Sequence, residues 1–418
     1  MNILHFSTAD RDGGSGRSAW RIHDGLRQRG HTSRMLCQYT ITNDTDTHTV
    51  SGSRLGERFD RAANSVTAKL GLQYTLVPST GRVRSHKWVE QADIIQLFNV
   101  HGGYFDLANL PHFSRRVPIV WRFSDMWPAT GHCAYSSDCA RWTIGCGSCP
   151  DLQTYPSVGK DFTAFLWRRK KRLYAQSRLS VVAPSSWAAD IAAKSPLFDG
   201  VDVHRIPNGA DREIFRPIDQ ATARTALGLP HDRKIILFSA QYAFDNPRKG
   251  TALLETALQA MQANDDVTLA VVGHDAEKWV GRVPQNIVPF GFVQDDRMLA
   301  IIYAACDMLV VPSASENLPN CIIEGFACGR AAVAFDAGGI RDAIKDNETG
   351  LLVPESDTAA LAKALDGVLG NDVMRERLND NALSFAQREF CAKVEATRFE
   401  RLYETLLDSA PNTAERAN

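Results

Sequence analysis

Apolar residues occur in short runs separated by polar and glycine-rich segments, a pattern typical of buried parallel strands alternating with helices. Residues 2–7 form the first apolar run, and a glycine-rich loop at 12–16 interrupts it. Ala19, Ile22 and Leu26 then recur at helical spacing, and Gly30 can end that helix. The opening therefore predicts a strand, a glycine loop, a helix and a strand. Further strands are predicted at 93–98, 117–122 and 179–183.

A second alternating series begins near residue 234. It predicts strands over 235–239, 267–272, 287–290, 308–311 and 331–335, and helices over 253–261, 296–304 and 359–369. The stretch from Ile206 to Pro217 has turn chemistry and a weak period, so we place a domain boundary there. We expect an α/β fold of two doubly wound, Rossmann-like domains facing a cleft, residues 1–205 and 206–390, with ligands at the carboxyl ends of the strands. A terminal helix and tail, 391–418, follow, and the helix is expected to pack against a domain.

Composition narrows the class of protein. The chain has 418 residues, 44% apolar and 23% charged, and its 47 basic and 48 acidic residues give a net charge of −1. A near-neutral chain is a poor candidate for a nucleic-acid binder. The sequence contains no run of 18 apolar residues, and its first residues become polar too early for a secretory signal. We therefore expect a cytoplasmic protein without a membrane-spanning helix.

The segment from Ser313 to Gly325 directly follows a predicted strand, where a ligand is expected to bind. Glu316 lies in the loop and Glu324 in the helix that Pro319 is expected to open. The two carboxylates can then meet one ligand from different sides, and backbone N–H groups near the helix start favour anions or sugar hydroxyls. The alternative is a capped surface helix with two solvated glutamates.

Arg248, Lys249 and Gly250 follow another predicted strand and open the next helix. Two cations at the positive end of a helix dipole are unfavourable unless an anion lies between them. A bound diphosphate would supply that anion. The alternative is an exposed basic pair.

Together these motifs resemble glycosyltransferase family 4, whose members are retaining enzymes of GT-B fold. The resemblance rests on Glu316-x7-Glu324, Arg248-Lys249-Gly250, Val271-Val272-Gly273, the Gly13-Gly14-Ser15-Gly16 loop and the segment Ile206 to Asp211. The segment Asp125 to Gly131, followed by four cysteines, resembles a bacterial exopolysaccharide and capsule-assembly subgroup of the colanic-acid type. The resemblance extends to about residue 390.

The resemblance implies a role for each matching position. Glu324 would bind the ribose of a sugar nucleotide and Glu316 the hydroxyls of the donor sugar, with the backbone of Asn317, Leu318, Pro319 and Asn320 completing the sugar site. Arg248 and Lys249 would hold the diphosphate without a metal cofactor. Gly14 and Gly16 would let the first domain's backbone approach the diphosphate, and Phe292 and Val293 would contact the base.

Two positions depart from the family pattern. Ser124 stands where the family often has a His before Asp125, so His101 or His132 is a candidate for that acceptor-side role; either is otherwise structural. Phe244 stands where the family commonly has its phosphate-binding Arg, several residues before Lys249.

Two clusters lie outside these motifs. One is a run of cations flanked by aromatic residues: Arg168, Arg169, Lys170, Lys171 and Arg172. Such a run suits an anionic membrane surface; the alternative is a solvated helix face.

The other cluster consists of four cysteines with the spacing C-x5-C-x6-C-x2-C: Cys133, Cys139, Cys146 and Cys149. This cluster predicts one structural Zn²⁺, with His132 able to replace one ligand. The alternative is four reduced thiols in an irregular loop.

The sequence thus predicts a glycosyltransferase that moves a sugar from a nucleotide donor to a saccharide acceptor, with retention. In the resembled subgroup the acceptor is typically lipid-linked. One alternative is a catalytically silent sugar-nucleotide-binding protein on the same fold. A nicotinamide-dependent oxidoreductase is another, but the first glycine loop is not Gly-x-Gly-x-x-Gly.

Overall fold

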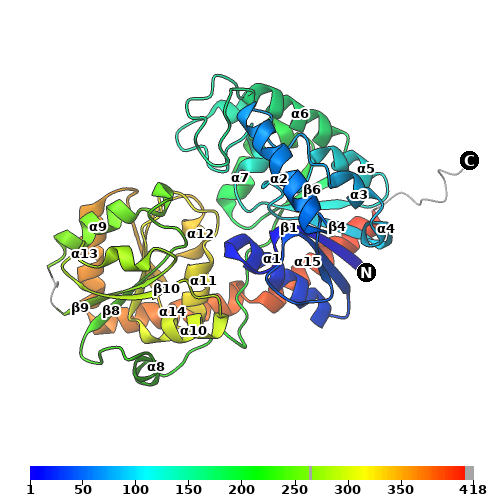
Figure 1. The fold of residues 1–418 in the computed structure, drawn as a ribbon. Helices are drawn as coiled ribbons and strands as arrows, with labels where there is room; N and C mark the ends of the chain where they lie inside the picture. Colours follow the sequence, from blue (N-terminus) through cyan, green and yellow to red (C-terminus); the bar gives the residue numbers. More distant parts are fainter. Residues whose placement is uncertain (263–265, 410–418) are drawn as a thin grey trace, which may run out of the picture. The chain divides into compact units, whose positions relative to one another are not determined.

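The computed structural model describes residues 1–262 and 266–409, and the chain forms two compact units. Unit 1 comprises Met1–Ile206 and the segment from Glu395 onward, and unit 2 comprises Pro207–Val394 (Figure 1). The chain first passes from unit 1 to unit 2 after Ile206, one residue beyond the domain boundary that the sequence predicted. Among the described residues, no helix is both long and apolar enough to cross a membrane.

Unit 1 is built on a parallel sheet of seven strands in the order β3-β2-β1-β4-β5-β6-β7. The strands are β1 Asn2–Ala9, β2 Thr32–Tyr39, β3 Thr47–Thr49, β4 Ile94–Leu97, β5 Ile119–Arg122, β6 Leu179–Ala183 and β7 Asp202–Arg205. The helices are α1 Gly13–Gln28, α2 Arg54–Lys69, α3 Thr80–Arg84, α4 Lys87–Gln91, α5 Leu110–Ser114, α6 Thr163–Ala175, α7 Ser186–Lys194 and α15 Ala392–Asp408.

The sheet of unit 1 is buried on both faces. Successive side chains point to opposite faces of a strand, and Ile3 and Leu4 accordingly belong to two different apolar clusters. The cluster around Ile3 includes residues of α1 and of α15, among them Phe399 and Tyr403. The chain therefore returns at its end to cover the first sheet, which confirms the expected packing of the terminal helix (Figure 1).

Unit 2 repeats this architecture with six parallel strands in the order β10-β9-β8-β11-β12-β13. The strands are β8 Lys234–Ser239, β9 Val267–Val272, β10 Asn286–Gly291, β11 Met308–Val311, β12 Ala332–Phe335 and β13 Gly350–Val353. The helices are α8 Gln220–Leu227, α9 Thr251–Ala260, α10 Asp296–Ala305, α11 Asn320–Ala327, α12 Ile340–Ala343, α13 Thr358–Leu369 and α14 Asp372–Glu389. Two doubly wound, Rossmann-like units are thus confirmed.

The glycine-rich segment after β1 differs from the prediction. Residues 13–16 do not form a separate loop, because α1 already begins at Gly13 and carries these glycines in its first turn. Gly13 has a φ of +66°, which a residue with a side chain rarely adopts. The glycines therefore set the entry into α1, and the N-terminus of that helix directly follows the carboxyl end of β1.

Candidate active site

The two cations of unit 2 meet the glutamate that the sequence placed opposite them. Lys249 Nζ donates a hydrogen bond of 2.6 Å to Glu316 Oε1, and Arg248 Nη1 lies 3.0 Å from the same oxygen. Arg248 also donates to the Ser315 carbonyl oxygen and accepts from the Ala314 N–H. The anion that these cations require at the helix start is therefore present in the protein itself, as the carboxylate of Glu316.

Close backbone packing creates this arrangement. Arg248 and Lys249 follow β8, Glu316 follows β11, and the two strands are neighbours in the sheet. Gly250 has a φ of +72°, and a Cβ there would lie 1.8 Å from the Pro312 carbonyl oxygen. Only glycine lets the two loops approach this closely, which explains the third residue of the Arg-Lys-Gly motif.

Glu316 is buried and ionised. Burial opposes its negative charge, but the charges of Arg248 and Lys249 and their hydrogen bonds more than offset that cost and lower the pKa of Glu316 to about 2. A carboxylate held in this way orients two cations at one sheet edge.

Glu324 lies within α11, as the sequence predicted, and is buried; its Oε2 accepts a hydrogen bond of 3.0 Å from the Tyr303 hydroxyl of α10. Pro319 caps α11 from the position just before its first residue, Asn320. The loop is tied to the start of unit 2 by Asn208, whose Nδ2 donates to Asn320 Oδ1 at 2.9 Å and to the Leu318 carbonyl oxygen at 3.2 Å. Asn208 lies in the Ile206–Asp211 motif, but the sequence carries no signal of this contact.

An aromatic stack lies after the carboxyl ends of β8, β9 and β10. The ring of His274 stacks on Tyr242 at 4.2 Å between centroids and on Phe292 at 4.3 Å. Tyr242 and Phe292 are both exposed, and Val293, next to Phe292, packs against the core. Of these rings, the sequence had singled out only Phe292; the other two also follow predicted strands within three residues.

Phe244, which stands at the family's Arg position, is part of the packing of unit 2. Its ring lies 5.6 Å from that of Trp279, and the Arg282 guanidinium lies 5.0 Å from its centroid. An apolar contact thus replaces a phosphate contact at this position.

In unit 1 the start of α1 is joined to the loop after β5. Ser15 Oγ lies 2.9 Å from Ser124 Oγ, and Arg122 Nη1 donates to Ser124 at 3.3 Å. Ser124 therefore serves as a link between Arg122 and the segment that contains Gly14 and Gly16. The residue that replaces the family His has a structural hydrogen bond to the glycine turn.

Asp125 is paired with His101 and not with His132. Asp125 Oδ2 lies 2.8 Å from His101 Nε2, Oδ1 accepts from the Trp127 N–H at 2.9 Å, and both side chains are buried. The Tyr155 hydroxyl lies 3.5 Å from His101 Nδ1. His132 instead contacts the Pro156 carbonyl oxygen and Cys149 Sγ, at 3.1 and 3.3 Å. Of the two candidate histidines, His101 is the one whose ring is oriented by a carboxylate.

The four cysteines lie in an irregular segment with several left-handed residues, among them Gly145, Cys146 and Gly147. All four are free thiols and partly buried, and burial raises the pKa of Cys133 to about 12 and that of Cys146 to about 11. Within the part of the chain that the structure describes, no group of three or more His, Cys, Asp or Glu side chains is arranged to hold a metal ion. The zinc site stays a prediction.

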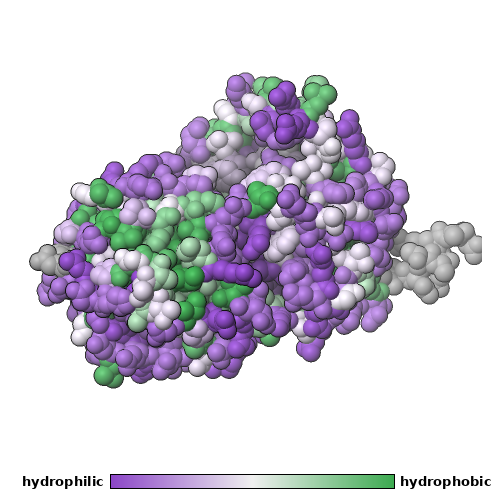
Figure 2. Space-filling view, turned by 60° about the horizontal axis from the view of Figure 1, so that its bottom comes forward, coloured by the Kyte–Doolittle hydropathy of each residue, from purple (hydrophilic) through white to green (hydrophobic). Residues whose placement is uncertain are grey.

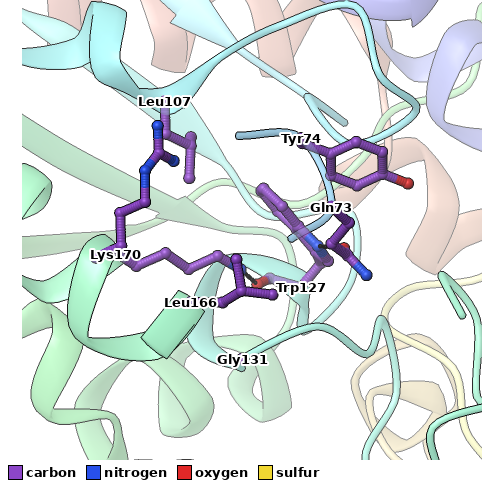
Figure 3. Close-up of a pocket in the computed structure, with 8 residues that line it drawn as sticks. Gln73, Tyr74, Leu107, Trp127, Gly131, Leu166 and Lys170 are labelled. Carbon is purple, nitrogen blue, oxygen red and sulfur yellow. Dashed lines mark hydrogen bonds between the residues drawn. The ribbon is translucent and has the colours of Figure 1, made fainter. Parts of the chain in front are cut away.

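The run of five cations on α6 does not form one surface, which corrects the sequence-based expectation. Lys170 is buried: its Nζ donates to the Trp127 and Thr130 carbonyl oxygens at 2.5 and 2.9 Å and lies 3.5 Å from the centroid of the Trp127 ring (Figure 3). Arg169 pairs with Asp106 at 2.5 Å. The helix turns these two cations inward, so that the exposed members are Arg168, Lys171 and Arg172.

Solved structures identify the fold. The chain aligns with sucrose-phosphate synthase of Thermosynechococcus elongatus at a TM-score of 0.69 and 19% identity, over 98% of this chain and 100% of that one. Anabaena HepE, solved with UDP and glucose, aligns at a TM-score of 0.67 and 17% identity, over 97% and 100% of the two chains. The protein therefore has the two-domain GT-B fold of glycosyltransferases.

Family models and curated relatives assign the family. Residues 12–214 match the model described as Glycosyltransferase Family 4, and residues 233–371 match Glycosyl transferases group 1. The phosphatidyl-myo-inositol mannosyltransferase of Mycobacterium leprae is 36% identical over 276 residues, which are 64% of this chain and 70% of the relative. The chain belongs to glycosyltransferase family 4. This membership decides against the nicotinamide-dependent alternative.

Other relatives match over different lengths. The Escherichia coli glycosyl transferase WcaC, named for colanic acid biosynthesis, is 24% identical over 390 residues, 87% of this chain and 90% of the relative. The phosphatidyl-myo-inositol mannosyltransferase of Mycobacterium tuberculosis is 37% identical over 220 residues, half of this chain. The match spans little more than half, 56%, of that relative's length.

Proposed function

We propose that this protein transfers a sugar from a nucleotide-sugar donor to a saccharide acceptor, with retention of configuration, in exopolysaccharide, capsule or O-antigen assembly. The observation that carries the proposal is the cluster of Lys249, Arg248 and Glu316 at the carboxyl edge of the sheet in unit 2. Membership of glycosyltransferase family 4 supports the reaction class. The UDP-glucose complex of Anabaena HepE, which shares the fold, supports a nucleotide-sugar donor.

On the donor side, the reaction breaks the bond between the anomeric carbon and a diphosphate oxygen. Lys249 and Arg248 stabilise the negative charge that develops on this leaving group, and they do so without a metal ion because they are already oriented by Glu316. Glu316 also binds the donor sugar with the backbone of residues 317–320, and Glu324 binds the ribose. Phe292, exposed in the aromatic stack with His274, contacts the base.

On the acceptor side, the new bond joins the acceptor oxygen to the anomeric carbon on the same face of the sugar. The departing phosphate oxygen takes the acceptor's proton, so the reaction needs no further base. His101, held by Asp125, binds a sugar hydroxyl in place of the missing family histidine at Ser124. The acceptor is lipid-linked, and the exposed cations Arg168, Lys171 and Arg172 favour contact with an anionic membrane surface.

A donor screen tests the proposal. The purified full-length protein is mixed with a panel of sugar nucleotides, and release of the free nucleotide and thermal stabilisation are both measured. We expect one donor class to be hydrolysed slowly and to stabilise the protein, with Lys249→Ala hydrolysing about 10²-fold more slowly. Stabilisation without hydrolysis or transfer would instead identify a silent sugar-nucleotide-binding protein.

A further inference from the structure

The helix α2 of unit 1 exposes a row of large apolar side chains. Leu55, Phe59 and Val66 are 62%, 61% and 59% exposed, and Leu70 just beyond the helix is 45% exposed. At about 100° per residue, these four positions fall within an arc of about 60° on the helix surface. They therefore form one continuous apolar stripe on α2. Figure 2 shows a few hydrophobic groups scattered among hydrophilic ones at the top of the view.

Cations border this stripe while the acidic residues of α2 are engaged elsewhere. Arg58 and Lys69 are exposed and lie beside the stripe at helical spacing. Glu57 pairs with Arg61 at 2.5 Å, and the buried Asp60 accepts a hydrogen bond from the Ser79 N–H at 2.9 Å. The stripe is thus apolar with a positive border, although the whole chain has a net charge of −1.

The start of α6 extends the same surface. The Gly159 N–H donates to the Ala68 carbonyl oxygen at 2.9 Å, and a Cβ at Gly71 would lie 3.0 Å from the ring of Phe162, so the end of α2 packs against the segment before α6. Phe162 and Phe165 are each 45% exposed. Helical spacing places Phe165 on the same face of α6 as the exposed Arg168 and Arg172. Both helices lie in unit 1 (Figure 1).

We propose that this α2–α6 face, made of Leu55, Phe59, Val66, Leu70, Phe162 and Phe165 with their bordering cations, docks onto an anionic lipid bilayer. An amphipathic helix that turns its apolar side outward between cations is the form in which proteins bind the interfacial region of a membrane. The apolar side chains enter the acyl boundary, and the cations contact anionic headgroups. The inference rests on the proposed membrane contact of α6 and identifies α2 as its main apolar element.

Co-sedimentation of the full-length protein with vesicles tests this proposal. Vesicles of phosphatidylcholine alone are compared with vesicles that also contain phosphatidylglycerol. The double variant Leu55→Ser with Phe59→Ser should bind the anionic vesicles about tenfold more weakly or worse, because two exposed apolar groups are lost. Arg58→Gln and Lys69→Gln should each weaken binding about fivefold, and added salt should act in the same direction.

Val373→Ser is the matched control, because Val373 is 79% exposed on α14 of unit 2 and outside the α2–α6 face. It should bind like the wild type. Equal binding of the wild type and the Leu55→Ser, Phe59→Ser variant would overturn the proposal. So would a dimer of the wild type that the same variant converts to a monomer without any vesicle binding, because the face would then join two copies of the chain.

Sugar-nucleotide hydrolysis without vesicles separates this inference from the proposed function. The α2–α6 variants should hydrolyse the donor at the wild-type rate, since the substituted residues lie outside the cluster of Lys249, Arg248 and Glu316. Vesicle binding without hydrolysis of any donor would remove the glycosyl-transfer proposal and leave the membrane face standing. Hydrolysis without binding to anionic vesicles would overturn the membrane proposal and leave the glycosyl-transfer proposal standing.

Discussion

Replacing Lys249 by Met separates the stabilising role of the cluster of Lys249, Arg248 and Glu316 from its catalytic role. The change removes one of the two cations that contact Glu316 Oε1 and keeps the aliphatic stem. A pKa lowered from 4.5 to about 2 corresponds to about 3 kcal/mol in favour of the ionised carboxylate. Because Arg248 remains, we expect Lys249→Met to lower the free energy of unfolding by about 1–2 kcal/mol at neutral pH.

The pH dependence follows from the direction of the pKa change. A carboxyl whose pKa is lowered by folding stabilises the protein fully above its unfolded pKa of 4.5, and this contribution is lost as the pH falls towards 2. The difference between the wild type and Lys249→Met should therefore be constant from pH 8 to about pH 5 and shrink at more acidic pH.

Urea unfolding of four proteins measures the coupling: the wild type, Lys249→Met, Glu316→Gln and the double variant. We expect a coupling energy of about 1–3 kcal/mol between Lys249 and Glu316, together with an about 10²-fold lower turnover of Lys249→Met at saturating donor. Additive single effects would refute the ion pair. Near wild-type turnover of Lys249→Met would refute the assignment of the leaving-group cation.

Three further predictions concern unit 1. His101→Ala should lower transfer by about 10²-fold or more while His132→Ala changes it less than tenfold, and equal losses would contradict the pairing of His101 with the acceptor. Protein purified without chelator should contain about one zinc ion per chain by elemental analysis, and a ratio near zero with all four thiols reactive would remove the zinc prediction. Lys170→Met should lower the free energy of unfolding in urea by about 2 kcal/mol, because two buried carbonyl groups lose their donor; an unchanged midpoint would contradict this.

Strands buried on both sides were predictable because their sequences are continuous apolar runs. The strands at 179–183, 267–272 and 308–311 have the predicted bounds and are buried throughout. The edge strands β3 and β7 were not predicted, because Thr47–Thr49 and Asp202–Arg205 are short and polar, and one side of each pairs with no other strand. In unit 2 the edge strand β10 was predicted at 287–290, whereas the edge strand β13, Gly350–Val353, was missed although it is apolar.

In the candidate site, too, some side-chain contacts could not be predicted from the sequence. The ends of the predicted strands placed Arg248 and Lys249 at the same sheet edge as Glu316. Their direct ion pair depends on β8 and β11 being neighbours in the sheet and on the close approach that Gly250 allows. The spacing of residues along the sequence reveals neither. The burial of Lys170 was not predictable, because its partners are backbone carbonyl groups some forty residues away. Sequence patterns identify charges; tertiary contacts decide which of them face the solvent.

The return of the chain from unit 2 to unit 1 has a consequence for the order in which the protein matures during synthesis. Unit 2, Pro207–Val394, is one continuous segment, and all of its described strands have left the ribosome before α15 appears. The sheet of unit 1, although translated first, keeps the side chains around Ile3 and Gln96 uncovered until Phe399 and Tyr403 arrive. The half of the molecule that is made first is therefore the half whose core is completed last, and a chain released after residue 394 would carry a complete second unit and an incompletely covered first one.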